Sequence, residues 1–129
     1  MSQDNKKSSI LLVDDDHFLL GMYSDKFKTA GFEITVAGGG IEALDKIKAG
    51  LIPDVMMLDV VMPGMDGIEL LKNIRDQKLA PNAKVIMLSN QSQEEDIEKA
   101  KALSVAGYIV KATTIPSEVV AETIKLIKD

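Results

Sequence analysis

Short hydrophobic runs alternate with longer amphipathic segments along this chain. Each run ends at a polar or turn-forming residue, as strands buried on both faces of a parallel sheet do. The pattern predicts five strands, over Ser9–Asp14, Glu33–Ala37, Asp54–Leu58, Lys84–Leu88 and Gly107–Val110.

The segments that follow these runs repeat apolar residues at helical spacing. Gly31 and Gly50 come directly after two of them, as residues that end helices do. Ser92 and Glu95 form a capping-box pattern at the start of another. The predicted helices cover His17–Ala30, Ile41–Ala49, Ile68–Gln77, Ser92–Leu103 and Val119–Lys128.

The spacing also predicts which helix faces are buried. In the first helix the expected inward stripe runs through Leu19, Met22, Tyr23, Lys26, Phe27 and Ala30, with the lysine as its polar exception. Phe18 and Leu20 are then expected to point away from it. In the last helix Val120, Ile124 and Ile127 are expected to face inward.

Five strands that are each followed by a helix predict an α/β fold with right-handed crossovers and a parallel sheet covered on both faces. We expect residues 1–8 to form a loose tail and residues 9–129 to form a single domain. No output domain is expected in this chain, because the sequence ends with the fifth predicted helix.

Composition narrows the classes of function. The 129 residues carry a formal net charge of −5 with a pI near 4.9, which disfavours non-specific binding of nucleic acid. There are no cysteines, so disulfides and thiolate zinc sites are excluded. No apolar run approaches the ~20 residues that cross a bilayer, and the polar N-terminus does not resemble a signal peptide. The expected compartment is the cytoplasm, with no membrane attachment.

Polar residues gather where the predicted strands end. Asp14 and Asp15 follow the first strand, Asp59 the third, Ser89 the fourth and Lys111 the fifth. In open α/β sheets ligands bind at these carboxyl ends. Three carboxylates meeting there repel one another unless some stay protonated or a cation neutralises them, and hard oxygen ligands suit Mg²⁺.

The same residues are the parts of a phosphoryl-transfer site. A lysine and a metal ion stabilise phosphoryl oxygens, a hydroxyl donates to them, and a carboxylate nucleophile forms an acyl phosphate. Taken singly, each residue has an ordinary explanation, such as a solvated loop or a helix cap. Their shared position at one end of the sheet favours the phosphoryl-transfer site.

Five segments, within about residues 9 to 128, closely resemble the bacterial response-regulator receiver family. The stretch around Asp59 is the most specific of them. The segments are LLVDDD, AGGGIEAL, MMLDVVMPGMDGIELL, VIMLSN and AGYIVKA. The resemblance implies a flavodoxin-like doubly wound sheet of strand order 2-1-3-4-5 with five helices.

The resemblance also implies roles for the site residues. Asp59 is the phosphoacceptor. Asp15 and Asp59 ligate Mg²⁺ directly, with Mn²⁺ as an alternative ion. Asp14 acts through water, and the backbone carbonyl of Val61 completes the protein ligands. Receivers of this kind are signalling domains that catalyse their own phosphorylation and dephosphorylation, and are not enzymes in the ordinary sense.

A switch and a set of partners follow from the same resemblance. Ser89 and Lys111 contact the phosphoryl oxygens, and Ser89 and Tyr108 move together when Asp59 is phosphorylated. This motion remodels the face made by the fourth helix, the fifth strand and the fifth helix, where an effector docks or a phosphorylation-dependent dimer forms. The phosphodonor is a sensor histidine kinase or a histidine phosphotransfer protein, and direct binding to nucleic acid is not expected.

The sequence departs from the family pattern near the site. Lys111 is followed by Ala112 where the family usually has proline, so we expect a trans peptide there, or a strained cis one. Val61 cannot orient a water molecule, which suggests slow loss of phosphate, although Gln91 could reach the site. Asn90 replaces a small residue and either restricts access to the phosphate, binds it or faces solvent.

Two further expectations concern the first helix. The family packs this helix on the kinase, so Phe18 and Leu20 are candidates for kinase docking. The lone histidine, His17, opens the helix and is expected to face outward rather than to bind metal.

Other functions compete with the signalling interpretation. A haloacid-dehalogenase-type phosphatase needs an Asp two residues after its nucleophile, where this chain has Val61. A flavodoxin-like cofactor binder needs a phosphate cradle after the first strand, where this chain has three acids. An inactive receiver that only binds proteins would not need the full set of Asp14, Asp15, Asp59, Ser89 and Lys111.

Overall fold

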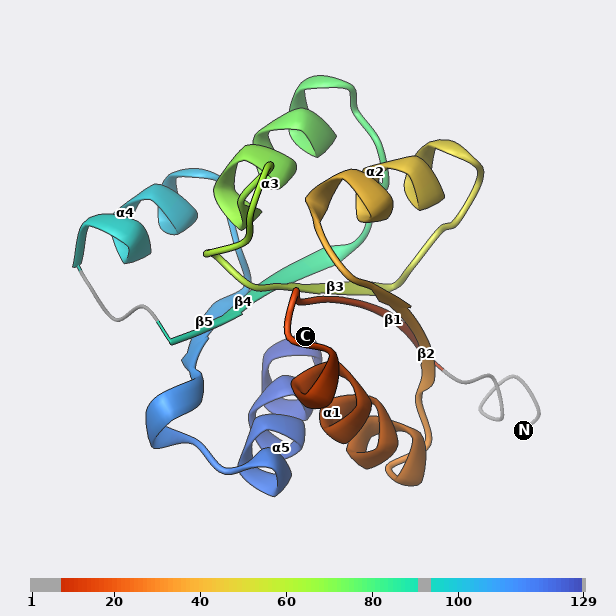
Figure 1. The fold of residues 1–129 in the computed structure, drawn as a ribbon, viewed down its shortest axis with the longest axis vertical. Coiled ribbons are helices and arrows are strands. Elements are labelled where there is room, and N and C mark those ends of the chain that lie inside the picture. Colours follow the sequence, from red (N-terminus) through yellow and green to blue (C-terminus); the bar gives the residue numbers. More distant parts are fainter. Residues whose placement is uncertain (1–7, 91–93, 129) are drawn as a thin grey trace.

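The computed structural model describes residues 8–90 and 94–128. Strands and helices alternate along the chain (Figure 1). In chain order they are β1 (Ser9–Val13), α1 (His17–Thr29), β2 (Glu33–Ala37), α2 (Gly40–Lys48), β3 (Val55–Leu58), α3 (Gly67–Asp76), β4 (Lys84–Ser89), α4 (Glu94–Ala102), β5 (Gly107–Val110), a 3₁₀ turn η2 (Lys111–Thr113) and α5 (Pro116–Ile127).

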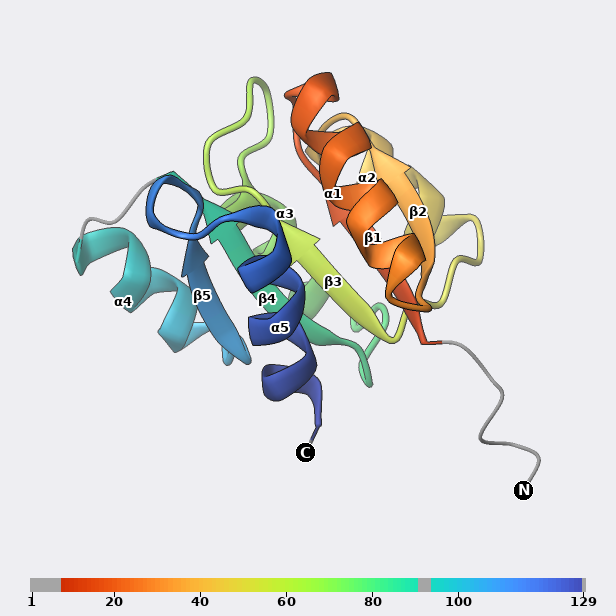
Figure 2. The ribbon, with the colours of Figure 1, turned by 90° about the horizontal axis from the view of Figure 1, so that it is seen from below.

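Within the described residues the strands form one parallel sheet of order β2-β1-β3-β4-β5, as predicted. Figure 1 shows α1 and α5 on one face of the sheet and α2, α3 and α4 on the other. The view in Figure 2 shows β2 and β5 at opposite edges. The first strand is thus inside the sheet, between β2 and β3, and the strand order changes direction beside it, which is where ligands bind in such folds.

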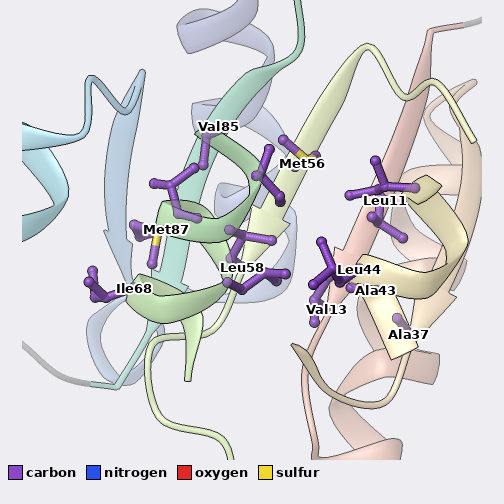
Figure 3. Packing of buried hydrophobic residues seen from close by; sticks show 14 of the residues in the cluster. Leu11, Val13, Ala37, Ala43, Leu44, Met56, Leu58, Ile68, Val85 and Met87 are labelled. Carbon is purple, nitrogen blue, oxygen red and sulfur yellow. The ribbon is translucent and has the colours of Figure 1, made fainter. Parts of the chain in front are cut away.

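The core is divided into two layers by the alternation of side chains along the strands. Leu11, Val13, Met56 and Leu58 point toward α2 and α3, where they pack with Leu44 and its neighbours (Figure 3). The intervening residues point to the opposite face and pack against α1 and α5. That second layer includes Ile10, Leu12, Met57, Phe27 and Val119.

The face of α1 differs from the prediction. Leu20 is 5% exposed and packs with Tyr23 and Phe27 in the layer under α1 and α5, so its expected outward position is wrong. Phe18 is 78% exposed, as predicted. The consecutive residues Phe18, Leu19 and Leu20 are all apolar and lie about 100° apart around a helix, so spacing alone could not select the buried one.

The last helix also differs from the prediction. It begins at Pro116 rather than Val119, because proline is well tolerated in the first turn and the Glu118 carboxylate accepts a hydrogen bond from the Ile115 amide at 3.2 Å. Val119 and Thr123 are fully buried while Ile124 is 38% exposed, so the expected inward position of Ile124 is wrong. Thr123 can be buried because its hydroxyl donates to the Val119 carbonyl at 2.8 Å.

Part of two predictions lies outside the described residues. The tail predicted for residues 1–8 is described only at Ser8, and the predicted helix start at Ser92 is not described. In the described part of α4, Ala100 is the buried residue. Among the described residues no helix is long and apolar enough to cross a membrane.

Candidate functional site

The two central strands bring Asp14 and Asp59 together. Val13 pairs with Leu58 at the ends of β1 and β3, and the Asp59 amide continues this ladder by donating to the Val13 carbonyl at 3.0 Å. By alternation both carboxylates point to the same side of the sheet. They are 3% and 7% exposed, so each is held at the rim of the core in a partly desolvated position.

Lys111 reaches both of these carboxylates from the far edge of the sheet. Its Nζ donates to Oδ2 of Asp14 and, at 3.2 Å, to Oδ2 of Asp59. The lysine side chain is only 6% exposed, so this ammonium group is itself buried. The predicted convergence of the ends of β1, β3 and β5 is therefore observed.

Asp15 adds a third carboxylate on the solvent side. Oxygen atoms of Asp14, Asp15 and Asp59 lie within 4.8 Å of one another. Three carboxylates and the Lys111 ammonium leave two negative charges uncompensated. A divalent cation would neutralise them, and three hard oxygen donors fit Mg²⁺ or Mn²⁺.

Ser89 and Tyr108 connect this cluster to the α4 side of the sheet. Ser89 ends β4, is 1% exposed and lies beside Asp59, where its hydroxyl opposes the rise in the pKa of that carboxyl. Tyr108 of β5 lies beside Ser89 in turn, and the Ser89 hydroxyl opposes the rise that burial gives the pKa of Tyr108. Neighbouring polar side chains therefore lead from Asp59 through Ser89 to Tyr108.

Burial and charge shift the acid–base properties of the site. Burial raises the pKa of Asp59, and the neighbouring Asp14 carboxylate raises it further, while Lys111 and Ser89 oppose the rise. Burial alone would lower the pKa of Lys111, but its contacts with Asp14 and Asp59 outweigh this and raise that pKa overall. The lysine is therefore held in its charged form beside the carboxylates.

Local hydrogen bonds fix the β1–α1 loop and the β3–α3 loop, which lie on either side of the acidic cluster. Asp16 caps α1 by accepting a hydrogen bond from the Leu19 amide at 3.1 Å. Asp66 and Glu69 form a reciprocal capping box at the start of α3. Gly67 donates to the Val60 carbonyl at 2.8 Å, and a Cβ on this glycine would lie 2.1 Å from the carbonyl oxygen of Asp59.

The carboxylates open into a pocket of about 340 Å³, which we call the acidic pocket. Val61 is 57% exposed on its wall, and its amide lies 3.4 Å from Oδ1 of Asp59. Asn90 is exposed and lines the same pocket, while Gln91 lies outside the described residues. The lining residues are Asp14, Asp15, Asp16, Leu19, Asp59, Val61, Ser89, Asn90 and Lys111.

Other sequence predictions near the site have clear outcomes. No described peptide bond is cis, so the Lys111–Ala112 bond is trans, as expected. His17 is exposed and lies near Gly38, on the side of the β2–α2 loop. Among the described residues, the group of three carboxylates that could hold a metal ion does not include it.

The sequence reasoning missed two structural contributions. The helical spacing predicts Leu19 on the buried stripe of α1, whereas the structure puts it in the wall of the acidic pocket as well. Gly67 supports the Asp59 backbone by its lack of a side chain. The adjacent Asp66 and Gly67 form a helix-start signal, but no local pattern reveals a contact with the preceding strand end.

The chain is similar to known proteins over most of its length. A family model for the response regulator receiver domain matches residues 10–122. The chemotaxis protein CheY of Thermotoga maritima is 38% identical over 120 residues, which is 92% of this chain and 97% of that protein. The DNA-binding response regulator MtrA of Mycobacterium tuberculosis is 32% identical over 118 residues, which is 92% of this chain and 50% of MtrA.

A solved structure gives the same result. The chemotaxis protein CheY4 of Vibrio cholerae superposes with a TM-score of 0.85 at 30% sequence identity, covering 94% of this chain and 99% of that one. The residues that the family model matches include all those that line the acidic pocket. This chain belongs to the response regulator receiver domain family, the signalling domains of two-component systems.

Proposed function

We propose that this domain accepts a phosphoryl group on Asp59 from the phosphohistidine of a sensor kinase or a histidine phosphotransfer protein, with Mg²⁺ bound beside it. Phosphorylation then alters the α4-β5-α5 face for an effector. The observation that carries the proposal is the buried contact of one ammonium group, Lys111, with both Asp14 and Asp59.

The donor set fits a hard divalent cation. Asp14, Asp15 and Asp59 would hold Mg²⁺, and the Val61 carbonyl, in the loop that lines the pocket, would complete the protein ligands. When bound, the ion supplies charge neutralisation for the phosphoryl oxygens. Mn²⁺ has the same ligand preference and is the expected substitute.

The chain's own residues then divide the work of phosphoryl transfer. A carboxylate oxygen of Asp59 attacks phosphorus, the phosphorus–nitrogen bond of the donor breaks, and the imidazole leaves as a neutral group after it takes up a proton. Lys111 places a positive charge beside the oxygens that carry the developing negative charge, and Ser89 offers a hydroxyl to one of them. Access of water to the Asp59 carboxylate is limited, because this residue is only 7% exposed.

Ser89 and Tyr108 supply the response to phosphorylation. In the unphosphorylated state Ser89 lies beside both Asp59 and Tyr108 and acts on the pKa of each. A phosphoryl group on Asp59 competes for the Ser89 hydroxyl and draws it toward the acidic pocket. Tyr108 then loses this partner and turns into the vacated space, which biases the outer face toward a second arrangement.

The phosphodonor is expected to contact the open mouth of the acidic pocket. Phe18 lies at the start of α1, close in sequence to Asp15 and Asp16, and its 78% exposure leaves an apolar ring available to a partner. We retain Phe18 as a docking residue. Leu20 is withdrawn from that role because its side chain is buried.

Incubation with acetyl phosphate and Mg²⁺ tests the proposal. Intact-mass measurement should show a single phosphoryl adduct on the parent protein and on Asp45→Asn, a control that removes an exposed acid on α2. The adduct should be absent from Asp59→Asn and from samples treated with a chelator. An unmodified parent protein would favour an inactive receiver that only binds proteins.

A further inference from the structure

The edge strand β5 and helix α5 enclose a second hollow, which we call the β5–α5 groove. Its volume is about 380 Å³. Figure 2 shows β5 at the edge of the sheet with α5 beside it. The groove is lined by Tyr108, Ile109, Val110, Thr113, Thr114, Glu118, Ala121 and Glu122.

The charge of this groove has one sign. Glu118 and Glu122 are exposed and lie four residues apart on α5, so they project from the same face of the helix. No lysine or arginine lines the groove, and within the described part of the chain neither carboxylate forms an ion pair. Outside the groove, the Asp96 carboxylate of α4 also helps to raise the pKa of Tyr108.

The groove is also the place where the phosphorylation site reaches the surface. Tyr108 forms part of its wall and lies beside Ser89, which in turn lies beside Asp59. A change at Asp59 that displaces Ser89 therefore changes the wall of the groove. The half-buried Val110 and the exposed Ala121 provide apolar contact area between the wall and the two glutamates.

We propose that the β5–α5 groove binds a cationic segment of the effector protein, with lysine or arginine side chains paired to Glu118 and Glu122 and apolar side chains between them. The inference rests on the proposed function, because Tyr108 couples the groove to Asp59. A second copy of this chain fits less well, since a two-fold axis through the groove would place the glutamates against their own copies.

A peptide of matched chemistry tests the groove directly. The probe is a capped hexapeptide of alternating lysine and leucine, and the control probe carries glutamate in place of lysine. Titration into isotope-labelled protein should shift the amide signals of β5 and the first two turns of α5. The glutamate peptide should produce no such shifts.

A pair of charge-matched variants separates specific binding from general attraction to an acidic protein. The double variant Glu118→Gln, Glu122→Gln should bind the lysine peptide about threefold to tenfold more weakly than the parent protein, which is the effect of losing two exposed ion pairs. Glutamine at position 118 keeps an oxygen that can accept the Ile115 amide, so α5 should still start correctly. Asp25→Asn with Asp45→Asn removes the same charge from α1 and α2 and should leave the affinity unchanged.

Three outcomes would overturn the inference: equal loss of affinity in the two double variants, shifts that map to another face, or self-association that depends on Glu118 and Glu122.

The titration is then repeated after treatment with acetyl phosphate and Mg²⁺, where tighter binding is expected as Tyr108 turns inward. An unchanged affinity despite a phosphoryl adduct would refute the coupling. Absence of the adduct would count against the proposed function. It would leave the test of the groove intact, because that test measures binding of the lysine peptide to the unphosphorylated protein.

Discussion

Replacement of Gly67 with alanine should damage the phosphorylation site although residue 67 never touches a phosphoryl group. Gly67 begins α3, and its Cα lies against the peptide that follows Asp59. An alanine Cβ would meet the Asp59 carbonyl oxygen at 2.1 Å, its carbonyl carbon at 2.9 Å and the Val60 Cα at 3.1 Å. All three are backbone atoms, so no side chain can rotate away to relieve the contact.

The structure sets the size of the effect. Ordinary contact for a Cβ begins near 3.4 Å, so the strand end or the helix must move by roughly 1.3 Å. Overpacking of this kind costs about 1–3 kcal/mol, which corresponds to a fall in Tm of roughly 5–10 °C for a domain of this size. A shift of about 1 Å in a reacting group lowers a rate by up to ~100-fold.

Two measurements on Gly67→Ala check this reasoning, namely the melting temperature and the rate of adduct formation with acetyl phosphate and Mg²⁺. The matched control is Gly21→Ala in the middle of α1, where a Cβ meets nothing within 4 Å. The control should gain about 0.5–1 kcal/mol from its better helix propensity and keep the parent rate. A Gly67→Ala protein with parental Tm and rate would refute the claim that close packing of α3 positions Asp59.

Three further predictions concern Asp59, Val61 and α1. Because the folded state raises the pKa of Asp59, stability is lost as pH rises from the ordinary carboxyl value through the raised one. In chelator-containing buffer Asp59→Asn should therefore raise Tm at pH 7, and the gain should vanish near pH ~3.5, below the ordinary value; an equal gain at both pH values would contradict this. Val61→Asn places a polar side chain on the pocket wall and should shorten the lifetime of the phosphorylated protein severalfold, and an unchanged decay would count against a water-orienting role for this position. Phe18→Lys should slow phosphotransfer from the cognate kinase with a change in stability below about 0.5 kcal/mol, whereas Leu20→Lys should unfold much of the protein; normal phosphotransfer to Phe18→Lys would exclude the docking role.

The sheet and the acidic cluster could be predicted from the sequence for a specific reason. Buried parallel strands are nearly continuous apolar runs, so Asp14, Asp59 and Ser89 stand out as the polar residues that end them. Parallel strands align these ends at one edge of the sheet. The position of Lys111 on β5 then follows from the same rule, and its long side chain spans the remaining distance to Asp14.

The helix faces could not be predicted in the same way. An apolar stripe shifted by one residue turns a helix by about 100°, and α1 offers two stripes of similar quality through Leu19 or Leu20. In α5 a buried Thr123 conceals the true inward face, because its hydroxyl is satisfied within the helix. Tertiary contacts decide both cases, and they also explain Gly67, whose requirement arises from a backbone contact eight residues away.

The central claim is that one carboxylate, at position 59, forms an acyl phosphate. Treatment of the phosphorylated protein with borohydride reduces an aspartyl phosphate to homoserine, which peptide sequencing by mass spectrometry can locate. The account predicts homoserine at position 59 alone, in samples that contain Mg²⁺. Reduction at Asp14, Asp15 or another acid, or a phosphoryl group found on His17 instead, would contradict it.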